Sequence, residues 1–332
     1  MYTAYGAIYS ESYNSQKFIH KKYLYTMKVL VATDKPFAKV AVNGIREIVE
    51  SAGFQLAILE KYKTPQELID AIADADAVII RSDLITKEVV DAAKNLKIVV
   101  RAGAGYDNID LAACTAKNVV AMNTPGQNAN AVAELVFGMA VLHNRHGFDG
   151  TSGSELKNKK IGIHAYGNVG KLVGQIAKGF GMKVFAFDPF LDKATIEKDG
   201  VTAITSVEEL YKECQYVSLH IPATAQTKNS IGEKLLLSMP EGATLINTAR
   251  CEVINEAELL KVMETRKDFS YLSDIAPACK AQFEANYKGR YFFTPKKLGA
   301  QTEEANINAG LAAARQIVGF LKTGERKFQL NK

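Results

Sequence analysis

A glycine-containing turn followed by an acid is the most specific chemical signal in the chain. Ala165-Tyr-Gly167-Asn-Val-Gly170 follows an apolar run at 160–164, and Asp188 ends the next apolar run. In dinucleotide-binding turns one glycine lets a pyrophosphate approach the helix N-terminus, and another lets helix and strand pack closely. An acidic residue at the end of the next strand accepts hydrogen bonds from ribose hydroxyls and repels a 2′-phosphate. The pattern predicts bound NAD rather than NADP, although alanine holds the first glycine position; a tight turn with packing glycines is the alternative.

Two adjacent lysines are a second candidate for chemistry. Lys296 and Lys297 lie in a loop after Pro295, and no acidic residue follows them before Glu303. A lysine accepts a proton near neutral pH when burial or a neighbouring cation lowers its pKa from about 10.4. One of the two lysines is therefore a candidate acid/base group, and the alternative is a pair of solvated loop lysines.

Two arginines end apolar runs in the N-terminal half. Arg81 follows the run "AVII" and Arg101 follows the run "KIVV". Ligands of open α/β sheets bind at the carboxyl ends of strands, and a guanidinium binds phosphate through a planar fork of donors. The two positions predict a site for a phosphorylated ligand, and exposed charge at strand ends is the alternative.

Alternating strand and helix patterns must position these residues. Short apolar, β-branched runs alternate with amphipathic segments from Met27 onward, and a second such series starts near Lys160. The pattern is typical of parallel sheets covered by helices on both faces, so the predicted fold class is α/β. The predicted strands are 28–34, 55–60, 77–82, 97–103, 160–167, 183–188, 216–221, 243–249 and 270–276, and the predicted helices include 40–52, 65–73, 86–93 and 303–321.

Composition restricts the classes of partner. A chain of 332 residues with 47% hydrophobic and 23% charged residues is typical of a soluble protein of two domains. A net charge of +5 without a dense basic block argues against nucleic acid, and no apolar run is long enough to span a membrane. The four cysteines form no C-x-x-C pair and the five histidines show no ligand spacing. We therefore predict reduced thiols, a cytoplasmic location and no metal.

Two segments fall outside the alternation. Residues 1–26 are rich in Tyr and Ser and lack the apolar core of a signal peptide, so we interpret them as a tail or an over-extended start. The segment Asn130–Leu142 is too rich in small and apolar residues for a surface helix. It is predicted to cross between domains or to pack against a second subunit.

The chain from Met27 to Lys332 resembles the D-isomer-specific 2-hydroxyacid dehydrogenases. The resemblance rests on the modified glycine turn and on RAGAGYDNID at 101–110, NTPGQNANAVAELVFGM at 123–139, LHIPATAQTKNSIG at 219–232, LINTARCEVINEAEL at 245–259 and TPKKLGAQTEEAN at 294–306. It implies two Rossmann-like, doubly wound domains. An NAD-binding domain at 124–295 would be inserted into a discontinuous substrate domain formed by 27–123 and 296–332. The resemblance also implies a homodimer or a dimer of dimers, without a C-terminal regulatory domain.

The resemblance implies roles for individual residues. Arg250 would bind the substrate carboxylate and polarise the C2 oxygen, and N–H groups of the Gly103-Ala104-Gly105 turn would bind the same carboxylate. Asp274 would accept from the nicotinamide carboxamide. His220 would contact the cofactor, or else be a satisfied histidine at a strand end. The full set of implied cofactor-binding residues is Gly167, Asn168, Val169, Gly170, Asp188, His220, Pro222, Thr227, Thr248, Ala249, Asp274 and Gly299.

Two positions depart from the family pattern. The family pairs a histidine acid/base with a glutamate, but here the glutamate position holds Cys279 and the histidine position falls on Lys296 or Lys297. We favour Lys297 because it directly precedes Leu298 and Gly299. The two changes fit each other, because a carboxylate would raise the pKa of a lysine that must lose its proton.

Together these features predict an NAD-dependent dehydrogenase that acts on a small anionic substrate. The resemblance is strongest to members that oxidise D-3-phosphoglycerate at C2 to 3-phosphohydroxypyruvate, the entry to serine biosynthesis. Arg81 and Arg101 favour that phosphorylated substrate. The alternatives are the glycerate/hydroxypyruvate reaction, and NAD sensing by a weakly catalytic binding protein.

Overall fold

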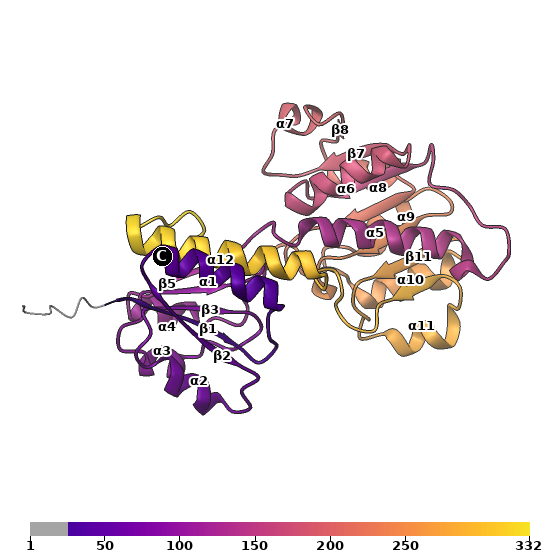
Figure 1. The fold of residues 1–332 in the computed structure, drawn as a ribbon. Helices are drawn as coiled ribbons and strands as arrows, with labels where there is room; N and C mark the ends of the chain where they lie inside the picture. Colours follow the sequence, from indigo (N-terminus) through magenta and orange to yellow (C-terminus); the bar gives the residue numbers. More distant parts are fainter. Residues whose placement is uncertain (1–25) are drawn as a thin grey trace, which may run out of the picture.

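Two parallel sheets organise residues 26–332, the part of the chain that the computed structural model describes (Figure 1). The five-stranded sheet has the order β2-β1-β3-β4-β5, and the seven-stranded sheet has the order β12-β11-β10-β9-β6-β7-β8. The prediction of an α/β fold with two Rossmann-like, doubly wound domains is confirmed. The interpretation of residues 1–26 lies, apart from Thr26, outside the described residues.

The elements alternate along the chain. The first sheet contains β1 (Lys28–Thr33), β2 (Gln55–Glu60), β3 (Ala77–Ile80), β4 (Ile98–Arg101) and β5 (Val120–Asn123), and the helices of this part are α1 (Lys39–Ser51), α2 (Pro65–Ile72), α3 (Lys87–Ala92) and α4 (Leu111–Ala116). The second sheet contains β6 (Lys160–His164), β7 (Lys183–Phe187), β8 (Thr202–Ala203), β9 (Tyr216–Leu219), β10 (Thr244–Asn247), β11 (Ser270–Ser273) and β12 (Tyr291–Phe293). The remaining helices are α5 (Ala129–Asn144), α6 (Asn168–Gly179), α7 (Lys193–Glu197), α8 (Val207–Glu213), α9 (Glu233–Ser238), α10 (Glu256–Thr265), α11 (Lys280–Asn286) and α12 (Glu303–Thr323), with short 3-10 helices η1 (His146–Phe148) and η2 (Cys251–Val253).

The predicted strands at 97–103, 160–167 and 243–249 are longer than the strands observed. Strands β4, β6 and β10 end at Arg101, His164 and Asn247, and the residues that follow turn away from the sheet. These turns contain the glycine motifs and the NTAR motif of the sequence. The candidate site residues therefore lie on loops beyond the carboxyl ends of parallel strands, where α/β sheets bind their ligands.

Helices bury both faces of the first sheet. Along β1, Val29 and Val31 pack into a cluster with α1 and α12, whereas Leu30 and Ala32 pack into the opposite cluster with α2 and α3. This period of two is why the strand reads as a continuous apolar run. Helix α12 thus packs on the first sheet although it follows the second sheet in sequence (Figure 1).

Local sequence explains where α12 begins and ends. Thr302 is its N-cap, and the Thr302 hydroxyl accepts from the Ala305 N–H at 3.1 Å. Two acids, Glu303 and Glu304, stand in the first turn, where the helix dipole favours negative charge. Gly324 ends the helix in the left-handed conformation with φ 75°. The N-terminus of α12 is therefore fixed directly after the loop that carries Lys297.

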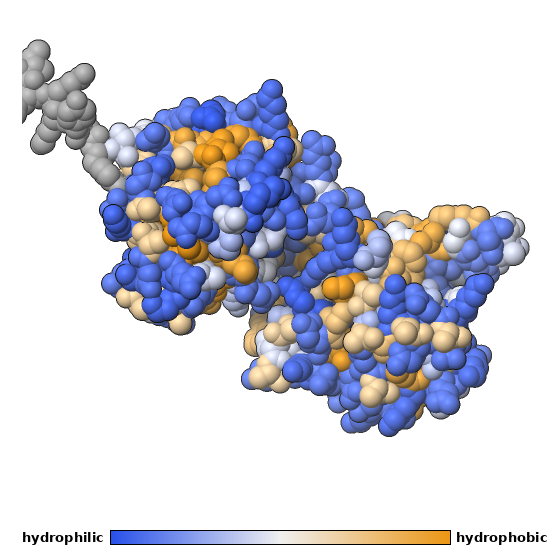
Figure 2. Space-filling model, turned by 90° about the horizontal axis from the view of Figure 1, so that it is seen from below, coloured by the Kyte–Doolittle hydropathy of each residue, from blue (hydrophilic) through white to orange (hydrophobic). Residues whose placement is uncertain are grey.

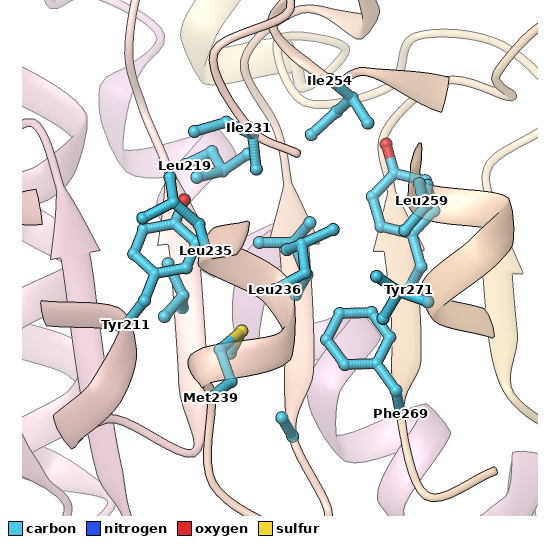
Figure 3. Packing of buried hydrophobic residues seen from close by; sticks show 14 of the residues in the cluster. Tyr211, Leu219, Ile231, Leu235, Leu236, Met239, Ile254, Leu259, Phe269 and Tyr271 are labelled. Carbon is cyan, nitrogen blue, oxygen red and sulfur yellow. The ribbon is translucent and has the colours of Figure 1, made fainter. Parts of the chain in front are cut away.

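The second sheet has an apolar core of its own. Figure 3 shows Tyr211 of α8, Leu236 of α9 and Tyr271 of β11 within one cluster of buried side chains. On the opposite face, Val136 and Phe137 of α5 pack with residues of α6 and β6. Helix α5, predicted to cross between domains or to meet a second subunit, is thus packed on the second sheet of its own chain. Within residues 26–332, no helix combines the length and the apolar character needed to cross a membrane.

Candidate active site

Two adjoining cavities lie between the two lobes, which Figure 2 shows on either side of a narrow waist. The larger has a volume of about 800 Å³ and the smaller about 340 Å³. The residues that line both are Ala104, Gly105, Tyr106, Asp107, Asn128, Ala249, Arg250, Lys297 and Ala300. The cavities thus bring together residues from the N-terminal part, the second series and the final loop.

A side-chain-stabilised turn positions Arg250. Asn247, buried at the end of β10, accepts from the Ala249 N–H at 2.9 Å and donates to the Arg250 carbonyl at 3.0 Å. The Arg250 guanidinium folds back and donates to the Ala249 carbonyl at 3.0 Å. Both cavities are lined by Arg250. Asparagine closes such turns because its short amide bonds the backbone two or three residues ahead.

The structure separates the two lysines. Lys297 lines both cavities, and its Nζ lies 3.3 Å from the Ala249 carbonyl oxygen. Both lysines are exposed, but the linings of the two cavities, as the structure describes them, do not include Lys296. Although the Lys297 side chain is accessible from the cleft, burial lowers its pKa below 10.5, and the Arg250 cation lowers it further. The geometry thus favours Lys297 over Lys296 as a proton-handling group.

Asp274 holds the loop that carries Lys297. Its buried carboxylate accepts from the backbone N–H of Leu298 at 2.7 Å and of Gly299 at 2.7 Å, and from the Thr294 hydroxyl at 3.1 Å. A Cβ on Gly299 would lie 2.7 Å from an Asp274 oxygen, so glycine is needed for this approach. The predicted contact of Asp274 with nicotinamide would add to these bonds, because a carboxylate has about four acceptor positions.

The side chain of Arg101 lies against the backbone of the turn that follows β4. Gly103, with φ 149°, donates to the Thr124 hydroxyl at 2.7 Å, and Asn123 donates to the Ala104 carbonyl at 2.6 Å. A Cβ on Gly103 would lie 1.6 Å from an Arg101 guanidinium nitrogen. Arg101 therefore reaches the larger cavity by crossing the space that this glycine leaves open. Gly105 lies beside Arg250, whose NH2 would be 3.3 Å from a Cβ built there.

Arg81 is placed differently from the other two arginines. Its guanidinium donates to the carbonyls of Lys35 at 2.8 Å and Pro36 at 3.1 Å, and to the Asn306 amide oxygen at 2.5 Å. Its neighbour Ser82 lines the larger cavity. As the structure describes them, the linings of the two cavities do not include Arg81. The structure gives Arg81 these protein partners, and the binding of phosphate by Arg81 stays a prediction.

The residues around Gly167 fit a dinucleotide. Gly167 is the N-cap of α6, and a Cβ there would meet nothing within 4 Å, which leaves room for a pyrophosphate at the helix N-terminus. A Cβ on Gly170 would lie 2.3 Å from the Ala165 carbonyl, so this glycine allows close helix–strand packing. Asp188 accepts from the N–H groups of Tyr166 and Phe190, both at 2.9 Å, and keeps acceptor positions for ribose hydroxyls.

The seven other predicted cofactor residues fall into two groups. Val169, His220, Pro222, Thr248 and Ala249 line the smaller cavity. Thr227 is exposed and donates to the Pro222 carbonyl at 2.5 Å, and the Asn168 amide lies near Gly126. Among the residues that the structure describes, the linings of the two cavities include neither of these two.

His220 combines the two alternatives left open by the sequence. One ring nitrogen lies 2.9 Å from the Ser218 hydroxyl and the other 3.4 Å from the Thr248 hydroxyl, while the ring lines the smaller cavity. Burial lowers the pKa of His220 to about 3, so the ring is neutral at physiological pH. A neutral ring with both nitrogens occupied suits contact with a cofactor better than proton transfer.

Sequence reasoning missed part of the cavity wall. Cys279 is buried in the apolar core of the second sheet and donates its N–H to Glu256, and burial raises its thiol pKa to about 12. The residues just before it line the larger cavity instead. The missed lining residues are Ser82, Tyr106, Asp107, Asn108, Asn128, Cys251, Glu252, Ile275, Ala276, Pro277, Ala278, Ala300 and Gln301. The position of several beside the quoted motifs was the signal that could have identified them.

These features are those of a dinucleotide-binding protein with two parallel sheets and a cavity between its two lobes. Residues 129–285 match the family model for the NAD binding domain of D-isomer specific 2-hydroxyacid dehydrogenases. A hydroxypyruvate reductase of Thermotoga maritima is 31% identical over 281 residues, which cover 79% of this chain and 90% of that protein. The chain belongs to the D-isomer specific 2-hydroxyacid dehydrogenase family, and its cofactor is NAD.

Other relatives carry a phosphoglycerate dehydrogenase name. The D-3-phosphoglycerate dehydrogenase of Methanocaldococcus jannaschii is 31% identical over 273 residues, which cover 78% of this chain and 52% of that protein. The chain thus spans about half the length of this relative. The crystal structure of NAD+-bound 3-phosphoglycerate dehydrogenase of Entamoeba histolytica is 50% identical, with a TM-score of 0.82, and the match covers 92% of this chain and 99% of that one.

Proposed function

We propose that the protein oxidises D-3-phosphoglycerate at C2 to 3-phosphohydroxypyruvate with NAD. The observation that carries this proposal is that Lys297, Arg250 and Arg101 line one cavity of about 800 Å³ between the domains. A proton acceptor beside two guanidinium groups suits a hydroxy acid with two anionic ends. The 50% identity to the NAD+-bound Entamoeba histolytica enzyme supports the same substrate.

The two guanidinium groups bind opposite ends of the substrate. Arg250, next to the smaller cavity, pairs with the carboxylate and faces the C2 oxygen, with the N–H groups of the Gly103–Gly105 turn on the same carboxylate. Arg101 binds the phosphate from the other side of the turn. Fixing both ends leaves C2 between Lys297 and the cofactor cavity, which is the orientation that hydride transfer needs.

Lys297 handles the proton of the reaction. As its neutral amine it takes the proton of the C2 hydroxyl and becomes an ammonium while the C2–H bond breaks and the ketone forms. The reverse reaction returns the proton from the ammonium to the ketone oxygen. Burial and the Arg250 cation lower the pKa of Lys297, which increases the neutral fraction at a given pH.

NAD, when bound, accepts the hydride that leaves C2. The chain's contribution is to hold it: Gly167 and the N-terminus of α6 bind the pyrophosphate, and Asp188 binds the ribose hydroxyls. Val169, His220 and Thr248 then form the wall of the smaller cavity beside Lys297. We further propose that the protein is a cytoplasmic homodimer or dimer of dimers that catalyses the first step of serine biosynthesis.

An unphosphorylated substrate is the second candidate. The protein partners of Arg81 leave Arg101 as the cavity arginine proposed for the phosphate. The Thermotoga maritima relative, which this chain covers over 90% of its length, is named a hydroxypyruvate reductase. Glycerate and hydroxypyruvate have the same reacting carbon and carboxylate, so they would use Lys297 and Arg250 in the same way.

Steady-state NAD reduction with D-3-phosphoglycerate and with D-glycerate tests the proposal. We expect kcat/KM to be about 10–100-fold higher for the phosphorylated acid, the worth of hydrogen bonds from a charged group. A preference for glycerate would replace the first candidate by the second. Turnover of neither acid, with NAD still bound, would indicate an NAD-binding protein without this activity.

A further inference from the structure

Two loops that follow neighbouring strands of the second sheet line the larger cavity. Residues 249–252 follow β10, and residues 275–278 follow β11. We call residues 275–278 the wall loop. The smaller cavity is lined by Ala249 and Arg250 of the first loop but, in the described part of the chain, by no residue of the wall loop. The wall loop therefore belongs to the part of the cleft that is proposed for the substrate.

The carboxylate of Glu256 holds the far end of the wall loop. Its two oxygens accept separately from the N–H of Ala278 at 3.0 Å and from the N–H of Cys279 at 2.9 Å. Glu256 is the first residue of α10, and Cys279 is the N-cap of α11. Hydrogen bonds to an ionised carboxylate are roughly twice as strong as neutral ones. One side chain thus fixes the wall loop at the point where it enters α11.

Asp274 fixes the near end of the wall loop. It directly precedes Ile275, and its buried carboxylate accepts from two N–H groups of the loop that carries Lys297. Between the two ends, the sulfur of Cys251 lies 4.0 Å from the Ile275 carbonyl oxygen and 3.9 Å from the Ala276 carbonyl oxygen. The wall loop is therefore held between two carboxylates, and only the near one also holds the lysine loop.

We propose that Glu256 is a positioning residue that fixes the shape of the substrate cavity through the wall loop. It acts on the backbone of Ala278 and Cys279, and the described linings of the two cavities do not include Glu256 itself. Because Asp274 holds the near end independently, loss of Glu256 should release the wall loop and leave Lys297 in place. The effect should fall on substrate binding. This inference rests on the proposed function for its kinetic measurements.

Steady-state kinetics of Glu256→Ala tests this role. We expect KM for D-3-phosphoglycerate to rise about 10-fold, an effect of the size of one lost hydrogen bond to a charged group, while kcat changes by less than about 2-fold. The dissociation constant of NAD should stay that of the wild type. Glu256→Gln has nearly the same shape and keeps one acceptor oxygen, so it should raise KM less and also serves if Glu256→Ala does not fold. An unchanged KM, or a fall in kcat larger than the rise in KM, would overturn the inference.

Glu258→Ala is the matched control. Glu258 stands two residues later on α10, and its carboxylate accepts at 2.7 Å from the N–H of Glu233, the first residue of α9. As the structure describes it, the lining of the larger cavity includes neither of these two residues. Both variants remove a carboxylate that anchors the start of a neighbouring helix, so both should lower the free energy of unfolding in urea. Only Glu256→Ala should raise KM, and the same KM in both variants would indicate a purely structural role.

Hydrogen exchange gives a readout without substrate. The N–H of Lys280 donates to the Pro277 carbonyl of the wall loop at 3.1 Å, and Glu256 does not take part in this bond. Exchange at the Lys280 amide should accelerate in Glu256→Ala and stay unchanged in Glu258→Ala, whereas exchange at the Glu233 amide should show the reverse. If the wild type oxidises neither acid, the proposed function fails, and exchange still decides on Glu256. Unchanged exchange at Lys280 in Glu256→Ala would contradict the inference.

Discussion

Lys297 and Arg250 donate to one and the same acceptor, the carbonyl oxygen of Ala249. The Nζ of Lys297 lies 3.3 Å from that oxygen and NH1 of Arg250 lies 3.0 Å from it. The two cations come from different loops and meet in the cavity wall. Their proximity lowers the pKa of Lys297, which burial already lowers. The proposed acid/base group and the proposed carboxylate ligand therefore form one unit.

Replacing Lys297 should remove most of the turnover. Lys297→Ala is expected to lower kcat by about 10²–10⁴, the usual effect of a general acid/base, with a smaller change in KM. Lys296→Ala is the matched control and should have a mild effect, because in the described part of the chain the cavity lining contains Lys297 and not Lys296. Steady-state kinetics measures both. Near-wild-type kcat in both variants would restore the interpretation of two solvated lysines.

The pH profile of kcat should report the pKa of Lys297. In the oxidation direction the neutral amine is active, so kcat should rise with pH through a pKa below the ordinary 10.5. Arg101→Ala removes one of the cations that lower this pKa, so the limb should move to higher pH. An unchanged limb in Arg101→Ala would show that another group controls the profile.

Removing Arg101 should also affect the phosphorylated substrate selectively. Arg101→Ala is expected to raise KM for D-3-phosphoglycerate about 10–100-fold, with a smaller effect on D-glycerate. Gly103→Ala should reproduce much of this loss, since its Cβ would lie 1.6 Å from an Arg101 guanidinium nitrogen. Equal losses on both acids, compared by kcat/KM, would argue against phosphate binding by Arg101.

Asp188 should determine the choice between NAD and NADP. Asp188→Ala is expected to weaken the binding of NAD and to reduce the preference for NAD over NADP. The reason is that the carboxylate accepts hydrogen bonds from ribose hydroxyls and repels a 2′-phosphate. Equilibrium binding of both cofactors measures the change. The variant also removes bonds to the Tyr166 and Phe190 N–H groups, so its unfolding should be measured in parallel. Efficient use of NADP by the wild type would contradict this role.

Ala165 is a position where glycine should be better. The residue has φ 79°, in the left-handed region, where an L-side chain costs about 1–2 kcal/mol. Because glycine also increases the entropy of the unfolded chain, Ala165→Gly should raise the free energy of unfolding by about 0.5–1 kcal/mol. Urea unfolding tests this, with the exposed helical Ala257→Gly as a control that should lower stability by about 1 kcal/mol. A lower free energy of unfolding in Ala165→Gly than in the wild type would contradict strain at Ala165.

His164 should make the fold sensitive to acid. Burial lowers its pKa to about 4, against 6.5 for an ordinary histidine, so the unfolded chain binds the proton more tightly. The stabilisation is complete above pH 6.5 and is lost as the pH falls toward 4, by about 2 kcal/mol between pH 7 and pH 5. Urea unfolding at both pH values should show a smaller difference in His164→Asn, while the exposed His146→Asn should keep it. An equal pH dependence in all three proteins would exclude His164 as the cause.

Local sequence predicted most of the sheet architecture, because side-chain periodicity and turn residues are local properties. The runs at 28–34, 55–60 and 216–221 correspond to β1, β2 and β9. Three strands were not predicted: β8 with two residues, β12 with three and β5 with four. Such short strands owe their conformation to pairing with a neighbouring strand, and pairing partners are distant in sequence.

The sequence by itself determined the class of site: a dinucleotide turn with Asp188, an arginine in the NTAR motif, and a lysine where the family has histidine. The tertiary structure decided which side chains face the cavity. Arg81 follows β3 and Arg101 ends the neighbouring strand β4, so the two are similar in sequence pattern. Yet Arg101 crosses Gly103 into the cavity, whereas Asn306 of the last helix binds Arg81. A guanidinium takes the nearest acceptors that packing provides, and for Arg81 the decisive acceptor comes from 225 residues away.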